Sequence, residues 1–203
     1  MTLNKWKYFF ICVYVCILIL VNFSFYFVDN NKYDNPYFVL AILGDGLKSE
    51  SYFPEDNSTI NLGVKLSWFI YVYNGMGVSQ YIKINVKILS SSLDSPNTTL
   101  CLPCSGSTLY EIKTIIKNNE TWIVPFVWII ESMDVTAEYI NIKSIRINND
   151  ILEVNVGNDG DQEYKIVFEL WVYDVSIGDF VFDLSGFSIS RCLWNQLFFK
   201  INI

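Results

Sequence analysis

Histidine is absent from the chain of 203 residues. Its absence excludes Ser-His-Asp and Cys-His catalysis, histidine general bases, and zinc or copper sites with imidazole ligands. Basic residues are also scarce, since 14 lysines and arginines stand against 21 acidic residues, a formal net charge of −7. This balance argues against nucleic acid as a partner and against a polybasic surface for lipid headgroups.

Charge is missing altogether from one run near the amino terminus, residues 8–28, YFFICVYVCILILVNFSFYFV. As a helix this run would extend about 31 Å, enough to cross the hydrocarbon core of a bilayer. Lys5 and Lys7 precede it and Asp29 follows it, so the positive-inside rule places residues 1–7 in the cytoplasm. A cleaved signal peptide is the alternative, but the run is long for one and no small-residue cleavage site follows. We therefore expect a single-pass signal anchor in the cell membrane, with the rest of the chain outside.

Helical periodicity is absent from the chain after residue 28. Residues 29–35 are predicted to form a short tether, and residues 36–203 to form an exterior domain. Apolar and polar residues alternate instead, most clearly over 64–72 and 82–88, which is typical of half-buried strands. Runs of this kind recur between turn signals, and no internal repeat is evident. The pattern predicts an all-β domain, an antiparallel β-sandwich of about nine strands. Pro125 interrupts one strand, TWIVPFVWII, and implies a sheet edge or a bulge there.

A second CxxC pair is also lacking. Cys101 and Cys104, in TTLCLPCSGST, have only Cys192 as a further exterior cysteine, whereas structural zinc sites commonly take two pairs. The motif lies in the longest polar loop and not at a helix start, which disfavours a thioredoxin-like site. Cysteines outside the cell tend to form disulfides. Because Pro103 bends the short connection, we favour a Cys101–Cys104 disulfide, with a bond to Cys192 as the alternative.

The acidic turn NVGNDGDQE brings together Asp159, Asp161 and Glu163. It is a weak candidate for calcium, because it lacks the spacing and the terminal glutamate of an EF-hand loop; a solvated turn is the simpler interpretation. No spacing identifies a pair of catalytic carboxylates. We expect no cofactor, no metal and no enzymatic activity.

Three sequons occur in the predicted loops, at Asn57, Asn97 and Asn119. Each is a candidate for N-glycosylation if the organism has that machinery, and a chain rich in asparagine also produces sequons by chance.

Aromatic residues are abundant. Phe69, Tyr71 and Tyr73 share the face of their strand that points away from the core. They form a possible binding face for a protein or a sugar. The alternative is a central strand that is covered on both faces.

Four segments carry a resemblance: PYFVLAILGDGLKSESYFP, NETWIVPFVWII, VFELWVYD and WNQLFF. Over most of residues 36–200 the chain is similar to an uncharacterised family of archaeal single-span membrane proteins with an exterior domain, frequent in ammonia-oxidising archaea. The resemblance implies an archaeal cell surface and an immunoglobulin-like sandwich. It brings no catalytic residue, and the CLPC loop is not part of the family pattern.

Together these features favour a non-enzymatic interaction or structural module of the envelope or of a membrane complex, with a protein partner. The alternative is an extracytoplasmic ligand-binding or sensor domain for a sugar, a peptide or a cation. A thiol redox enzyme would rest on Cys101 and Cys104 alone.

Overall fold

A computed structural model describes residues 36–136, 139–159, 162–185 and 192–202, together with Tyr14 and Ile17. The chain divides into two compact units, Met1–Asn35 and Pro36–Ile203. The predicted span at 8–28 and tether at 29–35 lie almost wholly outside the described residues. Within the described part, no helix has both the length and the apolar character needed to cross a membrane.

The described part of the second unit contains eleven strands and two short 3-10 helices. In chain order they are β1 (Tyr37–Leu43), η1 (Asp45–Leu47), η2 (Pro54–Asp56), β2 (Thr59–Ile60), β3 (Leu66–Gly75), β4 (Gln80–Ser90), β5 (Tyr110–Ile116), β6 (Glu120–Val135), β7 (Tyr139–Ile147), β8 (Asp150–Asp159), β9 (Glu163–Asp174), β10 (Asp179–Val181) and β11 (Leu193–Ile201).

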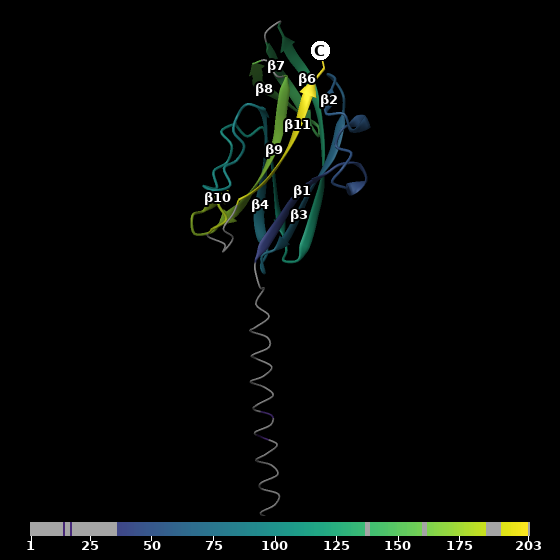
Figure 1. Cartoon of the computed structure of the whole chain (residues 1–203). Helices are drawn as coiled ribbons and strands as arrows, with labels where there is room; N and C mark the ends of the chain where they lie inside the picture. The colour runs from purple at the N-terminus through teal and green to yellow at the C-terminus, as the bar shows by residue number, and fades with distance from the viewer. Residues whose placement is uncertain are drawn as a thin grey trace, which may run out of the picture. The chain divides into compact units, whose positions relative to one another are not determined.

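These strands form two sheets that pack face to face (Figure 1). Sheet 1 has the order β1-β3-β6-β7-β8, and sheet 2 the order β2-β11-β9-β4-β5, with β10 paired to β9. The runs β1-β3-β6 and β11-β9-β4-β5 follow the A-B-E and G-F-C-C′ orders of immunoglobulin-like sandwiches. The predicted all-β sandwich is therefore confirmed. The predicted antiparallel pairing holds for the described strands except β2 and β11, which pair in parallel. The described strands outnumber the predicted nine partly because β2 and β10 are only two and three residues long.

Pro125 lies in β6, a strand that has neighbours on both sides over part of its length. It faces Phe69 of β3, whereas β7 joins β6 only from Trp128 onward. Because only β3 runs beside β6 at Pro125 among the described strands, the missing N–H leaves the ladder between β6 and β7 intact. Among the described strands, β6 is thus an edge strand at Pro125 but not along its whole length. The irregularity in its pairing with β7 lies further on, between Ile130 and Met133.

Alternation along the strands builds the core between the sheets. The predicted inward residues of β3, from Leu66 to Val72, are buried. Trp68 lies at the centre of an aromatic cluster, with ring centroids 6.3 Å from Phe126, 5.2 Å from Trp128 and 6.3 Å from Phe168. Its indole N–H donates to the carbonyl of Tyr52. The segment between β1 and β2, which the sequence pattern did not resolve, therefore covers the indole and satisfies its only polar group.

Trp68→Ala should lower the free energy of unfolding by roughly 3–5 kcal/mol, because it leaves a cavity inside this cluster. Denaturant titration of the purified protein measures the change. Ile115→Ala is the matched control, since Ile115 is 67% exposed and its truncation should change stability by less than about 0.5 kcal/mol. Equal effects at the two positions would contradict this account of the core.

Candidate functional site

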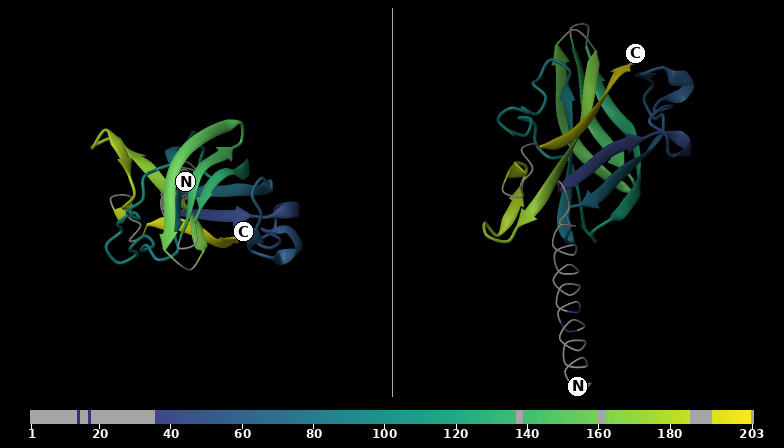
Figure 2. Two further views of the ribbon diagram at one scale, coloured as in Figure 1. Left: turned by 90° about the horizontal axis from the view of Figure 1, so that it is seen from above. Right: turned by 60° about the horizontal axis from the view of Figure 1, so that its bottom comes forward.

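The outer face of sheet 2 is polar in sequence but buried in the structure. On β4 the outward residues include Lys87, which is only 4% exposed, and on β9 they include Glu169, which is fully buried. They are covered by residues 91–109, which we call the cover segment. It is the predicted polar loop, and it lies against the outside of β4 and β9 (the teal loop in Figures 1 and 2). Cys104 of the CLPC motif therefore belongs to a packed layer of the protein.

An ion pair holds the second half of the cover segment. Lys87 Nζ lies 3.0 Å from Glu169 Oε2 and donates to the carbonyl of Cys104 at 2.8 Å. The Cys104 N–H donates to Glu169 Oε1 at 2.9 Å, and the Trp171 indole N–H to Oε2 at 3.3 Å. Both charges thus have hydrogen-bond partners, which a buried ion pair requires.

The Cys104 thiol belongs to the same network, since its Sγ donates to Glu169 Oε1 at 3.2 Å. Burial, followed by the charge of Glu169, raises the pKa of Cys104 to about 11. The thiol is therefore protonated at neutral pH and acts as a hydrogen-bond donor. The thiolate is the nucleophile and the metal ligand, so this arrangement does not favour redox chemistry at Cys104.

A second lysine holds the first half of the cover segment. Lys165 Nζ donates to the carbonyl of Leu93 and to Ser95 Oγ, the latter at 3.1 Å. Ser95 Oγ in turn donates to Gln196 Oε1 at 2.8 Å, which connects the segment to β11. Burial lowers the pKa of Lys165.

Close packing completes the cover. A Cβ atom on Gly106 would lie 2.1 Å from Leu89 Cδ2, so any larger residue would push this side chain aside. Cys104, Leu89 and Val167 form a small apolar cluster beneath the segment. The cover segment is thus fixed by charge, by hydrogen bonds and by packing.

The turn at residues 175–178 and the following strand β10, which we call the β10 arm, pack on the other half of the same face. Phe180 lies beside Tyr81, with ring centroids 5.0 Å apart, and Lys83 Nζ is 5.0 Å from the centroids of both Trp171 and Phe180. Figure 2 shows the cover segment and the β10 arm on one side of the sandwich. Together they cover the central strands of sheet 2.

The outer face of sheet 1 has a different character. Phe69, Tyr71 and Tyr73 lie on it and are all partly exposed. Strand pairing places Phe69 between Leu43 and Pro125. We call the following set the apolar face: Tyr37, Val39, Ala41, Leu43, Phe69, Tyr71, Tyr73, Ile123 and Pro125.

The apolar face contains no charged residue and is open to solvent. Tyr37, Val39 and Ile123 are 48%, 38% and 42% exposed. The strand β3 is central, as one interpretation of the sequence held, but its outer aromatic residues are not fully covered. Contiguous exposed apolar surface on a protein typically marks an interaction site.

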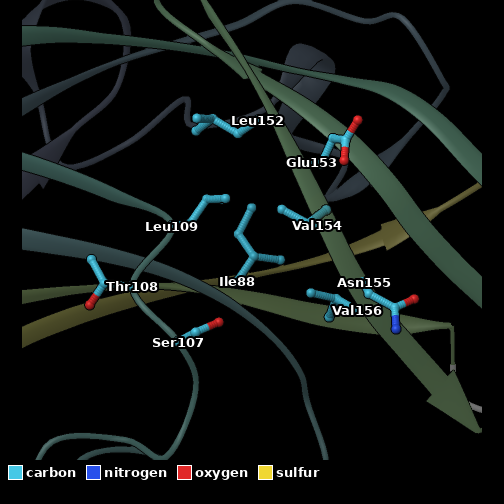
Figure 3. A pocket seen from close by; sticks show the side chains of 9 residues that line it. All are labelled: Ile88, Ser107, Thr108, Leu109, Leu152, Glu153, Val154, Asn155 and Val156. Carbon is cyan, nitrogen blue, oxygen red and sulfur yellow. The ribbon is translucent and has the colours of Figure 1, made fainter.

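A groove of about 510 Å³ lies beside β8, the last strand of sheet 1 among the described residues (Figure 3). Leu152, Val154 and Val156 point into it, toward Leu109 and Ile88, while Glu153 and Asn155 point away. β8 pairs only with β7 among the described strands, so its other edge offers backbone donors and acceptors next to apolar side chains. The sequence analysis missed this groove, because it arises where the two sheets separate.

The acidic turn gives no support for calcium in the described residues. Asp161 lies outside them, only the backbone of Asp159 is described, and Glu163 is half-buried. Among the described residues, no three histidine, cysteine, aspartate or glutamate side chains come together in a way that could hold a metal. The calcium candidate stays a prediction.

All three sequon asparagines are exposed. Asn57 follows η2, Asn97 lies in the cover segment, and Asn119 is in the turn before β6, where its Oδ1 accepts from the Tyr73 hydroxyl at 3.2 Å. Their surface positions agree with what an acceptor requires, and their modification stays a prediction.

The three cysteines of the described part are free thiols. Cys104 faces Glu169, while Cys101 Sγ lies 3.8 Å from the carbonyl of Thr98. The predicted Cys101–Cys104 disulfide stays a prediction, and the two thiols have different neighbours in the structure.

No protein-family model matches the chain, and no curated protein matches it. Among solved structures it is similar to a CARDB domain from Pyrococcus furiosus in complex with di-metal ions, at 9% identity and a TM-score of 0.41, over 84% of this chain and 91% of that one. It is also similar to a chain of the human seminal plasma complex of zinc 2-glycoprotein and prolactin inducible protein, at 6% identity and a TM-score of 0.39, over 85% and 100%.

A Listeria innocua β-glucosidase gives 12% identity and a TM-score of 0.40, over 82% of this chain but only 16% of that one. These likenesses identify neither a family nor an activity.

Glu169→Gln should lower the free energy of unfolding by roughly 3–5 kcal/mol, because it leaves the Lys87 ammonium buried without a counter-charge. The cover segment should also become the first site of limited proteolysis. Denaturant titration and peptide mapping measure the two effects.

Glu111→Gln is the matched control. Glu111 pairs with Lys113 at 2.8 Å and with Lys83 at 3.5 Å, but its own side chain is 40% exposed, and an exposed pair contributes less than about 1 kcal/mol. A loss at Glu169 no larger than that at Glu111 would show that the buried pair does not hold the cover segment.

Proposed function

We propose that the protein is a membrane-anchored interaction module whose apolar face binds a protein partner in the cell envelope or in a membrane complex. The observation that carries the proposal is the contrast between the two sheets. Sheet 2 has its central strands covered by the cover segment and the β10 arm, whereas sheet 1 presents nine uncharged residues that remain partly in solvent.

The chemistry of the apolar face suits a protein surface. Tyrosine and phenylalanine are enriched in the centres of protein interfaces, where charged residues are depleted. Tyr37 and Tyr73 pack with ring centroids 5.6 Å apart, so part of the face is already ordered before any partner binds. A pre-ordered aromatic surface loses little conformational entropy on binding.

Three parts of the proposal come from the sequence alone. They are the membrane anchor, the extracytoplasmic location and the archaeal family. The uncharged run at residues 8–28 and the lysines before it support a membrane span with this orientation. The absence of histidine throughout the chain supports a function in binding and not in catalysis.

Replacing two residues of the apolar face, Tyr71→Lys with Ile123→Lys, should abolish recovery of a partner from gently solubilised membranes, because two ammonium groups would be desolvated in the interface. Co-purification followed by mass spectrometry measures the recovery. Circular dichroism should be unchanged, since both side chains point outward.

The matched control is Ile115→Lys, which adds a charge to an exposed position of β5 in the other sheet. The control should keep the partner. Two results would count against the proposal: purification of the unsubstituted protein without any partner, or an equal loss of the partner with the control variant.

The groove beside β8 favours a second candidate, an extended peptide as ligand. An open strand edge next to apolar pockets suits binding by strand addition, in which main-chain hydrogen bonds give affinity and alternate side chains give specificity. This candidate corresponds to the peptide-binding alternative from the sequence.

For this second candidate, Val154→Asp should abolish binding of extended apolar peptides, because it places a carboxylate on the groove wall. Glu153→Gln is the control, since Glu153 points away from the groove. A peptide array read by fluorescence would give at least a tenfold difference in affinity between the two variants; equal binding would exclude the groove as the site.

A further inference from the structure

The tip of the cover segment brings two thiols together. A pair of hydrogen bonds between Asn97 and Leu102, at 2.9 and 3.2 Å, closes the tip, and Cys101 lies within it in the left-handed region at φ 47°. Cys101 Sγ is 3.8 Å from the carbonyl of Thr98, and Cys192 Sγ is 3.8 Å from the carbonyl of Asn97. The two sulfur atoms therefore lie on neighbouring carbonyl groups of one turn.

The Cys101 side chain lies close enough to Cys192 to affect its pKa. Burial, followed by a hydrogen bond with the Cys101 side chain, raises the pKa of Cys192 to about 11. Nearby, the Ser95–Gln196 hydrogen bond already joins the cover segment to β11. Cys192 immediately precedes β11, so the Ser95–Gln196 hydrogen bond also helps to keep Cys192 near the tip.

Cys104 is not placed to compete for Cys101. Its thiol donates to Glu169, and its N–H and carbonyl are bound to the Glu169–Lys87 pair. A bond to Cys101 would take the Cys104 thiol from its buried partner and leave a carboxylate oxygen with one donor fewer.

We propose that Cys101 and Cys192 form a disulfide that fastens the tip of the cover segment to the start of β11. The bond joins two positions far apart in the sequence, and so constrains the unfolded chain more than a bond within the CLPC motif would. The modification is the oxidation of a preformed thiol pair, with Cys104 left reduced.

A small-molecule disulfide such as oxidised glutathione is a sufficient oxidant. The Cys101 thiolate attacks one sulfur of glutathione disulfide, which breaks the S–S bond and releases one glutathione thiolate. Cys192 loses its proton and attacks the mixed disulfide at Cys101, forming the Cys101–Cys192 bond and releasing the second glutathione. Two protein thiols are oxidised, one disulfide is reduced, and the two protons end on the released thiols. The first attack falls to Cys101, since it is the more exposed of the two.

The test oxidises the purified full-length protein with glutathione disulfide, blocks the remaining thiols under denaturing conditions, and maps disulfide-linked peptides by mass spectrometry. We expect one linked pair, Cys101 with Cys192, and an alkylated Cys104. We also expect the oxidised protein to melt roughly 5–10 °C higher than the reduced protein.

Three serine variants make the test specific. Cys101→Ser and Cys192→Ser should each abolish the rise in melting temperature on oxidation. Cys104→Ser keeps a donor for Glu169 and should retain both the linked peptide and the rise. A Cys101–Cys104 peptide, a bond between two copies, or three free thiols after oxidation would each overturn the proposal.

Discussion

The buried ion pair between Lys87 and Glu169 is the interaction on which the outer architecture depends. Two opposite charges on neighbouring strands of one sheet face would ordinarily remain in solvent, where their attraction is weak. Here the cover segment removes them from water. Cys104 supplies both a donor and an acceptor to the pair, and Trp171 supplies a further donor, which offsets the cost of burial. The pair positions the segment, and the segment makes the pair stable. The two features therefore support each other, and Lys165 and the packing at Gly106 add to the hold on the segment.

This dependence divides the protein into a closed side and an open side. With the cover segment and the β10 arm packed on sheet 2, the polar and aromatic residues of β4 and β9 become part of a second, smaller interior. In the described part of the chain no segment of this kind packs over β1 and β3 of sheet 1, and the outer aromatic residues of β3 stay half in solvent. An interaction surface is therefore most readily located on sheet 1, even though sheet 2 carries more of the conspicuous sequence features.

The sequence predicted the strands well and the surfaces poorly, for a physical reason. Period-two alternation is a local property, and it identified the buried residues of β3 and β4. Alternation separates the two faces of a strand but does not say what lies over the outer one. Lys87 lies on the outer face of β4, as alternation implies, but its side chain is buried because residues 91–109 pack over it. The partner of Lys87, Glu169, stands 82 positions away in the chain, and only the register of β4 with β9 brings the two together. The groove beside β8 depends in the same way on where two sheets diverge.

The CLPC motif shows that sequence spacing does not predict the environment of each cysteine. Its two cysteines look equivalent in sequence, but the fold assigns them to different environments within three residues. Cys104 lies in the buried charge network, where its protonated thiol donates a hydrogen bond to the Glu169 carboxylate. Cys101 lies at the tip, beyond that network, next to two leucines that are 64% and 53% exposed. The tip lacks the charge and the packing that hold the rest of the cover segment, so it is the part that would open first. A covalent bond would therefore stabilise this tip most, and the Cys192 thiol lies 3.8 Å from the Asn97 carbonyl in the same turn.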